Sequence, residues 1–220
     1  MARAELVDEE HFALLNSLAL KKVATVAAVA EAAGMPVGDV ERLLSDLEAA
    51  GAVERAGAHL VPTELGTAKA KQYADARYGP LRADPAVERW AARFDGVNRR
   101  FLATMASWET VEEEGESVAN DHHDADYDSR VISRIDALLV RGDKAIEELG
   151  QRVPRLLRYR DRLDAAFRKV DEGDVSYVAG SAVDSIRSIW AEMDEDFQQI
   201  LGKQPAGDQP VSTGRDRGTS

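Results

Sequence analysis

The densest group of side chains able to hold a metal ion lies between residues 120 and 128. Asp124, Asp126 and Asp128 alternate as carboxylates do in a calcium loop, but the glycine and the distal glutamate of such a loop are absent. The two adjacent histidines point in different directions and seldom bind one ion together. We therefore interpret the segment as a solvated loop in which Asp126 caps the next helix, and we expect no metal site and no cofactor.

A second chemical feature is the basic stretch from Arg152 to Lys169, where seven arginines and lysines outnumber two aspartates. Arginine forks bind phosphates and carboxylates well, so this stretch could contact an anionic ligand or a DNA backbone. The alternative is a helix face that is neutralised by acidic helices beside it. We favour the second interpretation, because charge runs are usually solvated faces.

The elements that could position a reading surface lie between His11 and Gly66. Apolar residues at helical spacing, capping residues and the Gly34-Met35-Pro36 turn predict three helices followed by a small hairpin. The expected helices span about residues 8–22, 25–34 and 37–50, and the strands span 53–55 and 59–61. This order is the plan of a winged helix-turn-helix.

In such a module the second helix of the pair enters the major groove. That helix is expected at residues 37–50, where Asp39, Glu41 and Asp46 would repel phosphates. The candidate DNA-binding residues are Arg42 and Ser45 on this helix, Arg55 and His59 on the wing, and Lys69 and Lys71 on the helix that follows.

The net charge of −12 is unfavourable for a protein that binds nucleic acid. Residues 1–80 carry 8 Lys and Arg against 12 Asp and Glu, and the rest of the chain carries 20 against 28. Any contact with double-stranded DNA must therefore come from a local patch. The alternative function is a winged-helix protein-interaction module that regulates a partner protein without binding DNA.

The segment from Gly34 to Arg55, followed by Val61-Pro62-Thr63-Glu64-Leu65-Gly66, resembles the MarR-like winged-helix transcriptional regulators. The resemblance covers about the first third of the chain. It implies a homodimer that binds a pseudo-palindromic operator and often responds to a small ligand. This sequence departs from the family pattern in its acidic reading helix and in its short, arginine-poor wing.

The remainder of the chain is predicted to be helical. A helix over residues 64–77 leads to an expected linker near residues 78–85, which contains Gly79-Pro80 and Asp84-Pro85. An acidic loop is expected at residues 111–126, and Gly180-Ser181 is expected to kink or restart the last helix. We divide the chain into a winged helix-turn-helix DNA-binding domain (residues 1–80), a helical dimerisation and effector domain (86–203) and a disordered tail (204–220).

This second half resembles the helical extension of a group of MarR-like regulators. Its polar residues could face a shared cavity that takes a small anionic or apolar effector. The aromatic stripe from Trp90 to Trp108 is more typical of a core or a dimer seam than of a ligand box. The candidate ligand-binding residues are Trp90, Arg99, Asn120, His122, Asp184, Arg187 and Trp190.

Several classes of protein are not indicated. The chain has no cysteine, and it shows no glycine-rich phosphate loop, nucleophile elbow or zinc-binding helix motif, so we do not expect an enzyme. No leader and no apolar run of membrane-spanning length is seen, and we expect a cytoplasmic protein. The expected fold is mostly α, a winged helix-turn-helix followed by an α-helical bundle, in a homodimeric DNA-binding transcriptional regulator.

Overall fold

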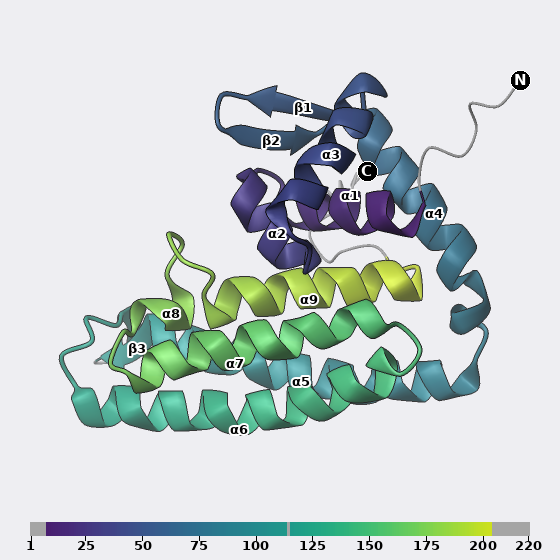
Figure 1. Cartoon of the computed structure of the whole chain (residues 1–220). Helices are drawn as coiled ribbons and strands as arrows, with labels where there is room; N and C mark the ends of the chain where they lie inside the picture. Colours follow the sequence, from purple (N-terminus) through teal and green to yellow (C-terminus); the bar gives the residue numbers. More distant parts are fainter. Residues whose placement is uncertain (1–7, 114, 204–220) are drawn as a thin grey trace, which may run out of the picture.

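The computed structural model describes residues 8–113 and 115–203. The winged helix lies on one side of the long C-terminal helices, and the chain crosses between the two regions along one edge (Figure 1). The fold is mostly helical, with a winged helix-turn-helix followed by a helical region, as the sequence predicts. The expected tail lies outside the described residues.

The winged helix consists of three short helices and a two-stranded hairpin. Each expected element is confirmed within a residue or two: α1 Glu9–Lys21, α2 Val26–Ala33, α3 Val37–Ala49, β1 Val53–Ala56 and β2 His59–Pro62.

Local hydrogen bonds explain where these helices begin and end. The side chains of Asp8 and Thr25 accept hydrogen bonds from backbone N–H groups in the first turns of α1 and α2. Gly34 ends α2 in the left-handed conformation, with φ at 66°, which glycine adopts without steric cost. The turn that follows sets α3 at an angle to α2, as a reading helix requires.

The wing is held to the rest of the module by backbone pairing. Leu60 on β2 is fully buried, and it exchanges two backbone hydrogen bonds with Ala24, which lies between α1 and α2. The hairpin is therefore anchored along one strand, while Arg55 and His59 remain exposed.

Helix α4 (Glu64–Arg82) corrects the expected linker at residues 78–85. Proline lacks the N–H that a helix interior needs, yet the helix continues through Pro80. Two tertiary contacts favour this continuation. Tyr78 is buried, and the guanidinium of Arg82 donates hydrogen bonds to the carbonyl oxygens of Ile200 and Gln199.

The second region consists of long helices that pack around an aromatic core. Its elements are α5 Pro85–Glu109, β3 Thr110–Glu113, β4 Glu116–Ala119, α6 Ala125–Gly150, the 3-10 turn η1 Pro154–Leu156, α7 Leu157–Asp171, α8 Ser176–Ala179 and α9 Ile186–Leu201. The expected restart after Gly180 is confirmed, since α9 begins at a Ser185 cap.

Two expectations for residues 111–128 are wrong. The expected acidic loop contains a hairpin in which Val111 pairs with Val118, and Gly115 adopts a φ of 88° at the turn. The cap of α6 is Asp124, which accepts the backbone N–H of Tyr127, and Asp126 lies inside the helix. Each strand of this hairpin has only four residues, and so short a stretch shows too little alternation of polar and apolar residues to predict a strand from the sequence.

The aromatic stripe of α5 is core, as its spacing predicts. Trp90, Phe94 and Phe101 are buried, and the ring of Trp190 from α9 stacks on Phe101 with 4.0 Å between centroids. A side chain at Gly142 on α6 would come within 2.9 Å of the Trp190 ring, so glycine permits this close approach.

Gly66 on α4 provides a direct test of how the wing is attached. A Cβ atom at this position would come within 2.0 Å of the carbonyl oxygen of Ala52. We expect Gly66→Ala to lower the free energy of unfolding by about 2 kcal/mol, because backbone atoms must move to relieve the overlap. Urea unfolding followed by circular dichroism measures the change.

Gly79→Ala on the same helix is the matched control. Nothing lies within 4 Å of a Cβ there, so we expect a gain of about 0.5 kcal/mol from reduced backbone freedom in the unfolded chain. Equal stabilities for the two variants would contradict the proposed backbone contact.

Candidate nucleic-acid interface

The exposed face of α3 carries the residues expected to read DNA. Arg42 and Ser45 are both exposed and lie one turn apart, while Val40, Leu43, Leu44 and Leu47 pack inward. Arg42 is the one cation of this helix, and the hydroxyl of Ser45 donates to the carbonyl oxygen of Glu41. The helix therefore offers one long cationic side chain and one short hydroxyl to a groove.

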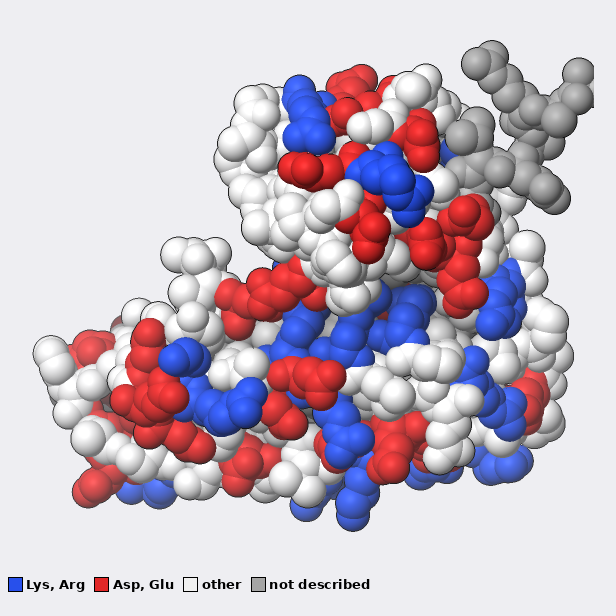
Figure 2. Space-filling model, viewed as in Figure 1, with Lys and Arg blue, Asp and Glu red and all other residues white. Residues whose placement is uncertain are grey.

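Carboxylates accompany the cations of this surface. The guanidinium of Arg42 lies 3.6 Å from a carboxylate oxygen of Glu10, and the Nε of Arg55 lies 2.6 Å from Glu48. Over the winged helix, Figure 2 shows acidic and basic side chains side by side. A phosphate must therefore compete with an intramolecular carboxylate for each of these arginines.

The remaining candidates fall in different places. His59 is exposed at the start of β2, on the same wing as Arg55. Lys69 is half-buried on α4. Lys71 donates a hydrogen bond to Asp75 at 2.9 Å and lines a cavity where α4 faces α9. The structure thus places both Arg55 and His59 on the wing, but on opposite faces of the hairpin, because Arg55 pairs with Leu60 and His59 with Ala56. Lys71 lies at the junction with the helical region.

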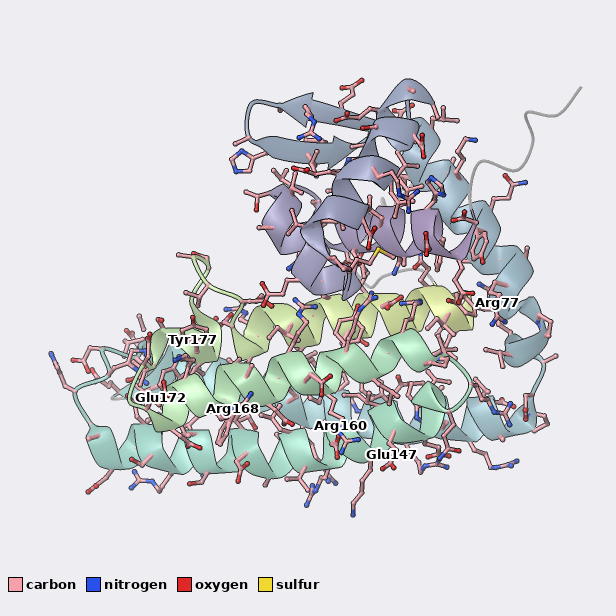
Figure 3. The ribbon with its side chains drawn as sticks, viewed as in Figure 1. Arg77, Glu147, Arg160, Arg168, Glu172 and Tyr177 are labelled. Atoms are coloured by element: carbon pink, nitrogen blue, oxygen red, sulfur yellow. The ribbon has the colours of Figure 1, made fainter. Side chains whose placement is uncertain are left out.

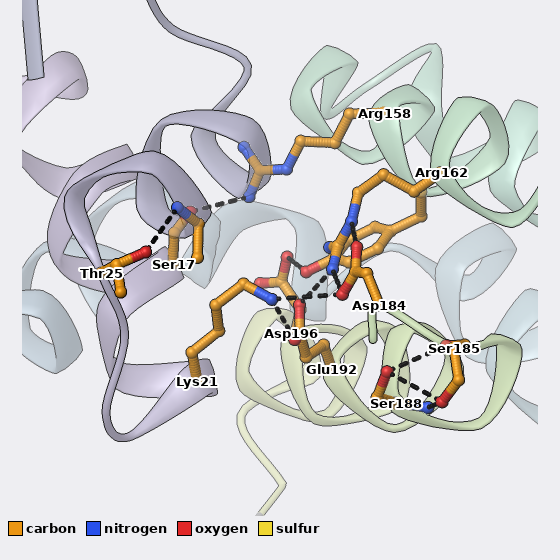
Figure 4. A network of polar contacts seen from close by, with 12 residues as sticks. Ser17, Lys21, Thr25, Arg158, Arg162, Asp184, Ser185, Ser188, Glu192 and Asp196 are labelled. Carbon is orange, nitrogen blue, oxygen red and sulfur yellow. Dashed lines mark hydrogen bonds and ion pairs between the residues drawn. The ribbon is translucent and has the colours of Figure 1, made fainter. Parts of the chain in front are cut away.

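The winged helix is joined to the helical region by a partly buried network of ion pairs (Figure 4). Lys21 at the end of α1 lies 2.7 Å from Glu192 and 3.4 Å from Asp184. Arg162 of α7 contacts the same two carboxylates at 2.8 and 2.9 Å. One cation from each region therefore shares the same pair of acids.

A second part of the network is centred on Asp196, which is fully buried on α9. Its carboxylate accepts hydrogen bonds from Arg155, from the hydroxyl of Tyr159 at 3.0 Å, and from the amide of Asn16 on α1 at 3.2 Å. The guanidinium of Arg155 also lies over the ring of Phe12 on α1. This carboxylate thereby connects α1, α7 and α9.

Opposing effects set the ionisation of Asp196. Burial opposes the charged form, but the positive charge of Arg155 and the hydrogen bonds it donates outweigh burial and lower the pKa of Asp196. Burial, reinforced by the Asp196 carboxylate, raises the pKa of the Tyr159 hydroxyl, which therefore stays a donor. The site therefore holds a buried pair of opposite charges.

The basic stretch at residues 152–169 is largely neutralised, as we favoured from the sequence. Arg152 contacts Asp84, and Lys169 contacts Glu172. Arg160, labelled in Figure 3, lies 2.6 Å from Asp143 on α6. The arginines at 155 and 162 face the carboxylates of the network described above. These contacts favour a role in packing the helices.

The candidate ligand-binding residues do not share one cavity. Trp90 and Trp190 are buried, and their indole N–H groups donate to the carbonyl oxygen of Ala145 and to Asn98. Arg99 is exposed on α5, Arg187 pairs with Glu109, and Asp184 belongs to the ion network.

Asn120 and His122 do lie together, at the far end of the helical region. Asn120 and the Nδ1 of His122 both contact the carboxylate of Asp128, at 3.0 and 2.9 Å, and the His122 ring packs on Trp108. His122 also has a positive φ of 59°, which is uncommon for this residue type. Within residues 8–113 and 115–203, no group of three or more potential ligands is arranged to hold a metal ion.

Residues 11–57 match the model of the IclR helix-turn-helix domain. The match covers most of α1, all of α2, α3 and β1, and ends in the turn of the wing. It supports a DNA-binding transcriptional regulator rather than an enzyme. No curated protein and no solved structure matches the chain.

The resemblance to MarR-like regulators is not supported, because IclR is a different family. The turn, the reading helix and the hairpin satisfy the same packing requirements in any winged helix, so these residues predict the winged-helix fold correctly without distinguishing one winged-helix family from another. No helix in the described part of the chain is long and apolar enough to cross a membrane.

The sequence-based predictions did not include Asp196 and Asn16 among the functional residues. A signal was present, because Asp196 falls on the apolar stripe of α9, between Met193 and Ile200. A carboxylate at a core position needs a buried partner. Asn16 similarly interrupts the apolar run of α1.

We expect Asp196→Asn to lower the free energy of unfolding by about 3 kcal/mol, because it leaves the charge of Arg155 buried without a counterion. Asp184→Asn is the matched control. Its side chain is 27% exposed and Glu192 remains beside the same cations, so a loss of about 1 kcal/mol or less is expected.

The pH dependence gives a second readout of the same variant. Because the folded state lowers the pKa of Asp196, its stabilising contribution is complete above the unfolded-state pKa of about 4 and is lost as pH falls through and below it. Asp196→Asn should therefore flatten the fall in stability at acidic pH. Parallel pH profiles for the variant and the wild type would contradict this assignment.

Proposed function

We propose that the chain is a cytoplasmic, homodimeric transcriptional regulator that places α3 in the major groove and the hairpin against the adjacent backbone. The match of residues 11–57 to a helix-turn-helix domain carries this proposal, and the exposed face of α3 supports it. The N-terminal half of a reading helix normally contacts base edges. Arg42 would contact a base edge or a phosphate, with Ser45 beside it.

Dimerisation follows from the small number of cations in one winged helix. A single α3 provides only Arg42, and the wing adds Arg55 and His59. Two copies on half-sites one helical turn apart would double these contacts. We place the dimer contacts in the helical region and assign the operator a pseudo-palindromic sequence.

A second candidate function is regulation of a partner protein by the same winged helix without DNA. The carboxylates beside Arg42 and Arg55 favour it, because they reduce the attraction for phosphates. On this alternative the two arginines would not be needed for any interaction with DNA.

The direct test is fluorescence anisotropy with labelled duplex DNA from upstream of the protein's own coding sequence. We expect the affinity for DNA to fall steeply between about 50 and 200 mM salt, as it does for proteins that contact several phosphates. Arg42→Ala should weaken binding about ten-fold, as loss of one specific side-chain contact does. Arg93→Ala, which removes an exposed arginine paired with Glu148 on the helical region, should leave it unchanged.

The opposite change tests the intramolecular competition. Glu48→Gln removes the carboxylate that contacts Arg55 and should strengthen DNA binding at low salt, with a smaller gain at high salt. Absence of binding to every upstream fragment at low salt would reject the proposal. If Arg42→Ala and the wild type bind DNA with equal affinity, α3 is not the helix that contacts the bases.

A further inference from the structure

A cavity of about 540 Å³ lies at the junction between the winged helix and the helical region. Side chains from α1, β2, α4 and α9 line it. None of the expected ligand-binding residues lies in its wall. Its volume is within the range of pockets that hold small organic molecules.

Most of the wall is apolar. The contributing residues include Ala19, Leu20, Val61, Pro62 and Ala70. Leu20 and Ala70 are buried, and the others are half-buried. A ligand with a substantial apolar body would therefore remove water from apolar surface on entering.

Two polar side chains of the wall carry buried oxygen atoms that accept no hydrogen bond from the described residues. Asn16 is completely buried, and its Nδ2 donates to the ionised carboxylate of Asp196. This contact fixes the orientation of the amide, so Oδ1 is the atom left over. Gln199 on α9 likewise has its Oε1 without a partner among the described groups. Leaving a buried acceptor unpaired is costly, so both atoms favour a donor from a bound molecule.

The charges of the wall favour an uncharged ligand. Lys71 is bonded to Asp75, and Lys203 lies 3.8 Å from Asp95. Burial raises the pKa of Glu195, against an opposing effect of Lys22. Lys71 and Lys203 thus face carboxylates of the chain itself, and a ligand anion would have to compete with those carboxylates for them.

We propose that this cavity binds a small uncharged molecule with an apolar body and an N–H or O–H donor directed at Asn16 and Gln199. A primary aromatic amide has this chemistry. The segment after Lys203 is a poor alternative occupant by composition, because residues 204–220 contain only Ala206 and Val211 as aliphatic side chains besides two prolines.

The position of the cavity suggests what binding would do. The ligand would contact α1 and β2 of the winged helix, the following helix α4, and α9 of the helical region. A molecule that prefers one arrangement of these elements shifts the population towards it, and α3 packs on α1 in the same module. This regulatory role rests on the proposed function, whereas binding to the cavity does not.

The test uses benzamide and N,N-dimethylbenzamide as probes against the full chain. The two probes share the ring and the carbonyl group, and only benzamide has N–H donors. We expect ligand-observed NMR to show benzamide binding with a Kd on the order of 1 mM, as suits a fragment of this size. N,N-dimethylbenzamide should bind at least five-fold more weakly. Equal binding of the two probes, or binding of neither, would overturn the proposal.

Variants locate the site. Ala19→Leu fills the cavity and should abolish benzamide binding, whereas Ala76→Leu, at an exposed position of α4, should leave it unchanged. Gln199→Met keeps the size of the side chain, removes the acceptor, and should weaken binding at least three-fold. Benzamide binding that survives both Ala19→Leu and Gln199→Met would place the probe elsewhere and overturn the assignment.

A chain that ends at Lys203 tests the tail as occupant. Benzamide binding that appears only in this shortened chain would show that the tail fills the cavity and would overturn the proposal. DNA anisotropy with and without benzamide is scored separately. Failure of the wild type to bind DNA rejects the proposed function and leaves the cavity assignment standing, while loss of probe binding alone rejects only the cavity.

Discussion

The contact between Arg155 and Asp196 is the constraint on which the arrangement of the winged helix depends. A carboxylate buried completely on α9 can stay ionised only with a cation beside it, and the same carboxylate also binds Asn16 of α1. The ion network of Lys21, Arg162, Asp184 and Glu192 lies beside it. Buried ion pairs contribute little net stability, but breaking one is costly, so they favour one docking of α1 on the helical region over others.

This constraint accounts for an apparent conflict in the charges. The chain is acidic overall and yet contains a helix-turn-helix domain. Many of its arginines are used inside the molecule to hold the helices together, and those on the winged helix face carboxylates. The affinity for DNA therefore depends on a few cationic side chains, for which phosphates compete with the carboxylates of the chain. Salt or the substitution of one charged residue can shift this competition.

The sequence was sufficient for the local structure of the winged helix and insufficient for contacts between distant segments. Capping residues and the apolar spacing of α1 to α3 predicted their bounds, since these signals are local. The helix through Pro80 was missed because its stability comes from Tyr78 and from contacts of Arg82 with α9, far along the chain. Asp196 was missed because its partners come from three helices, and Trp90 and Trp190, predicted to bind a ligand, are packed in the core.

If the contact between Arg155 and Asp196 fixes α1 on the helical region, the winged helix and the helical region should unfold as one unit. Trp90, Trp108 and Trp190 all lie in the helical region, so tryptophan fluorescence reports that region alone, while amide hydrogen exchange along α3 reports the winged helix. With both probes followed against urea, the account predicts the same free energy of unfolding and the same midpoint. Loss of protection in α3 at a lower urea concentration than the change in fluorescence would contradict it.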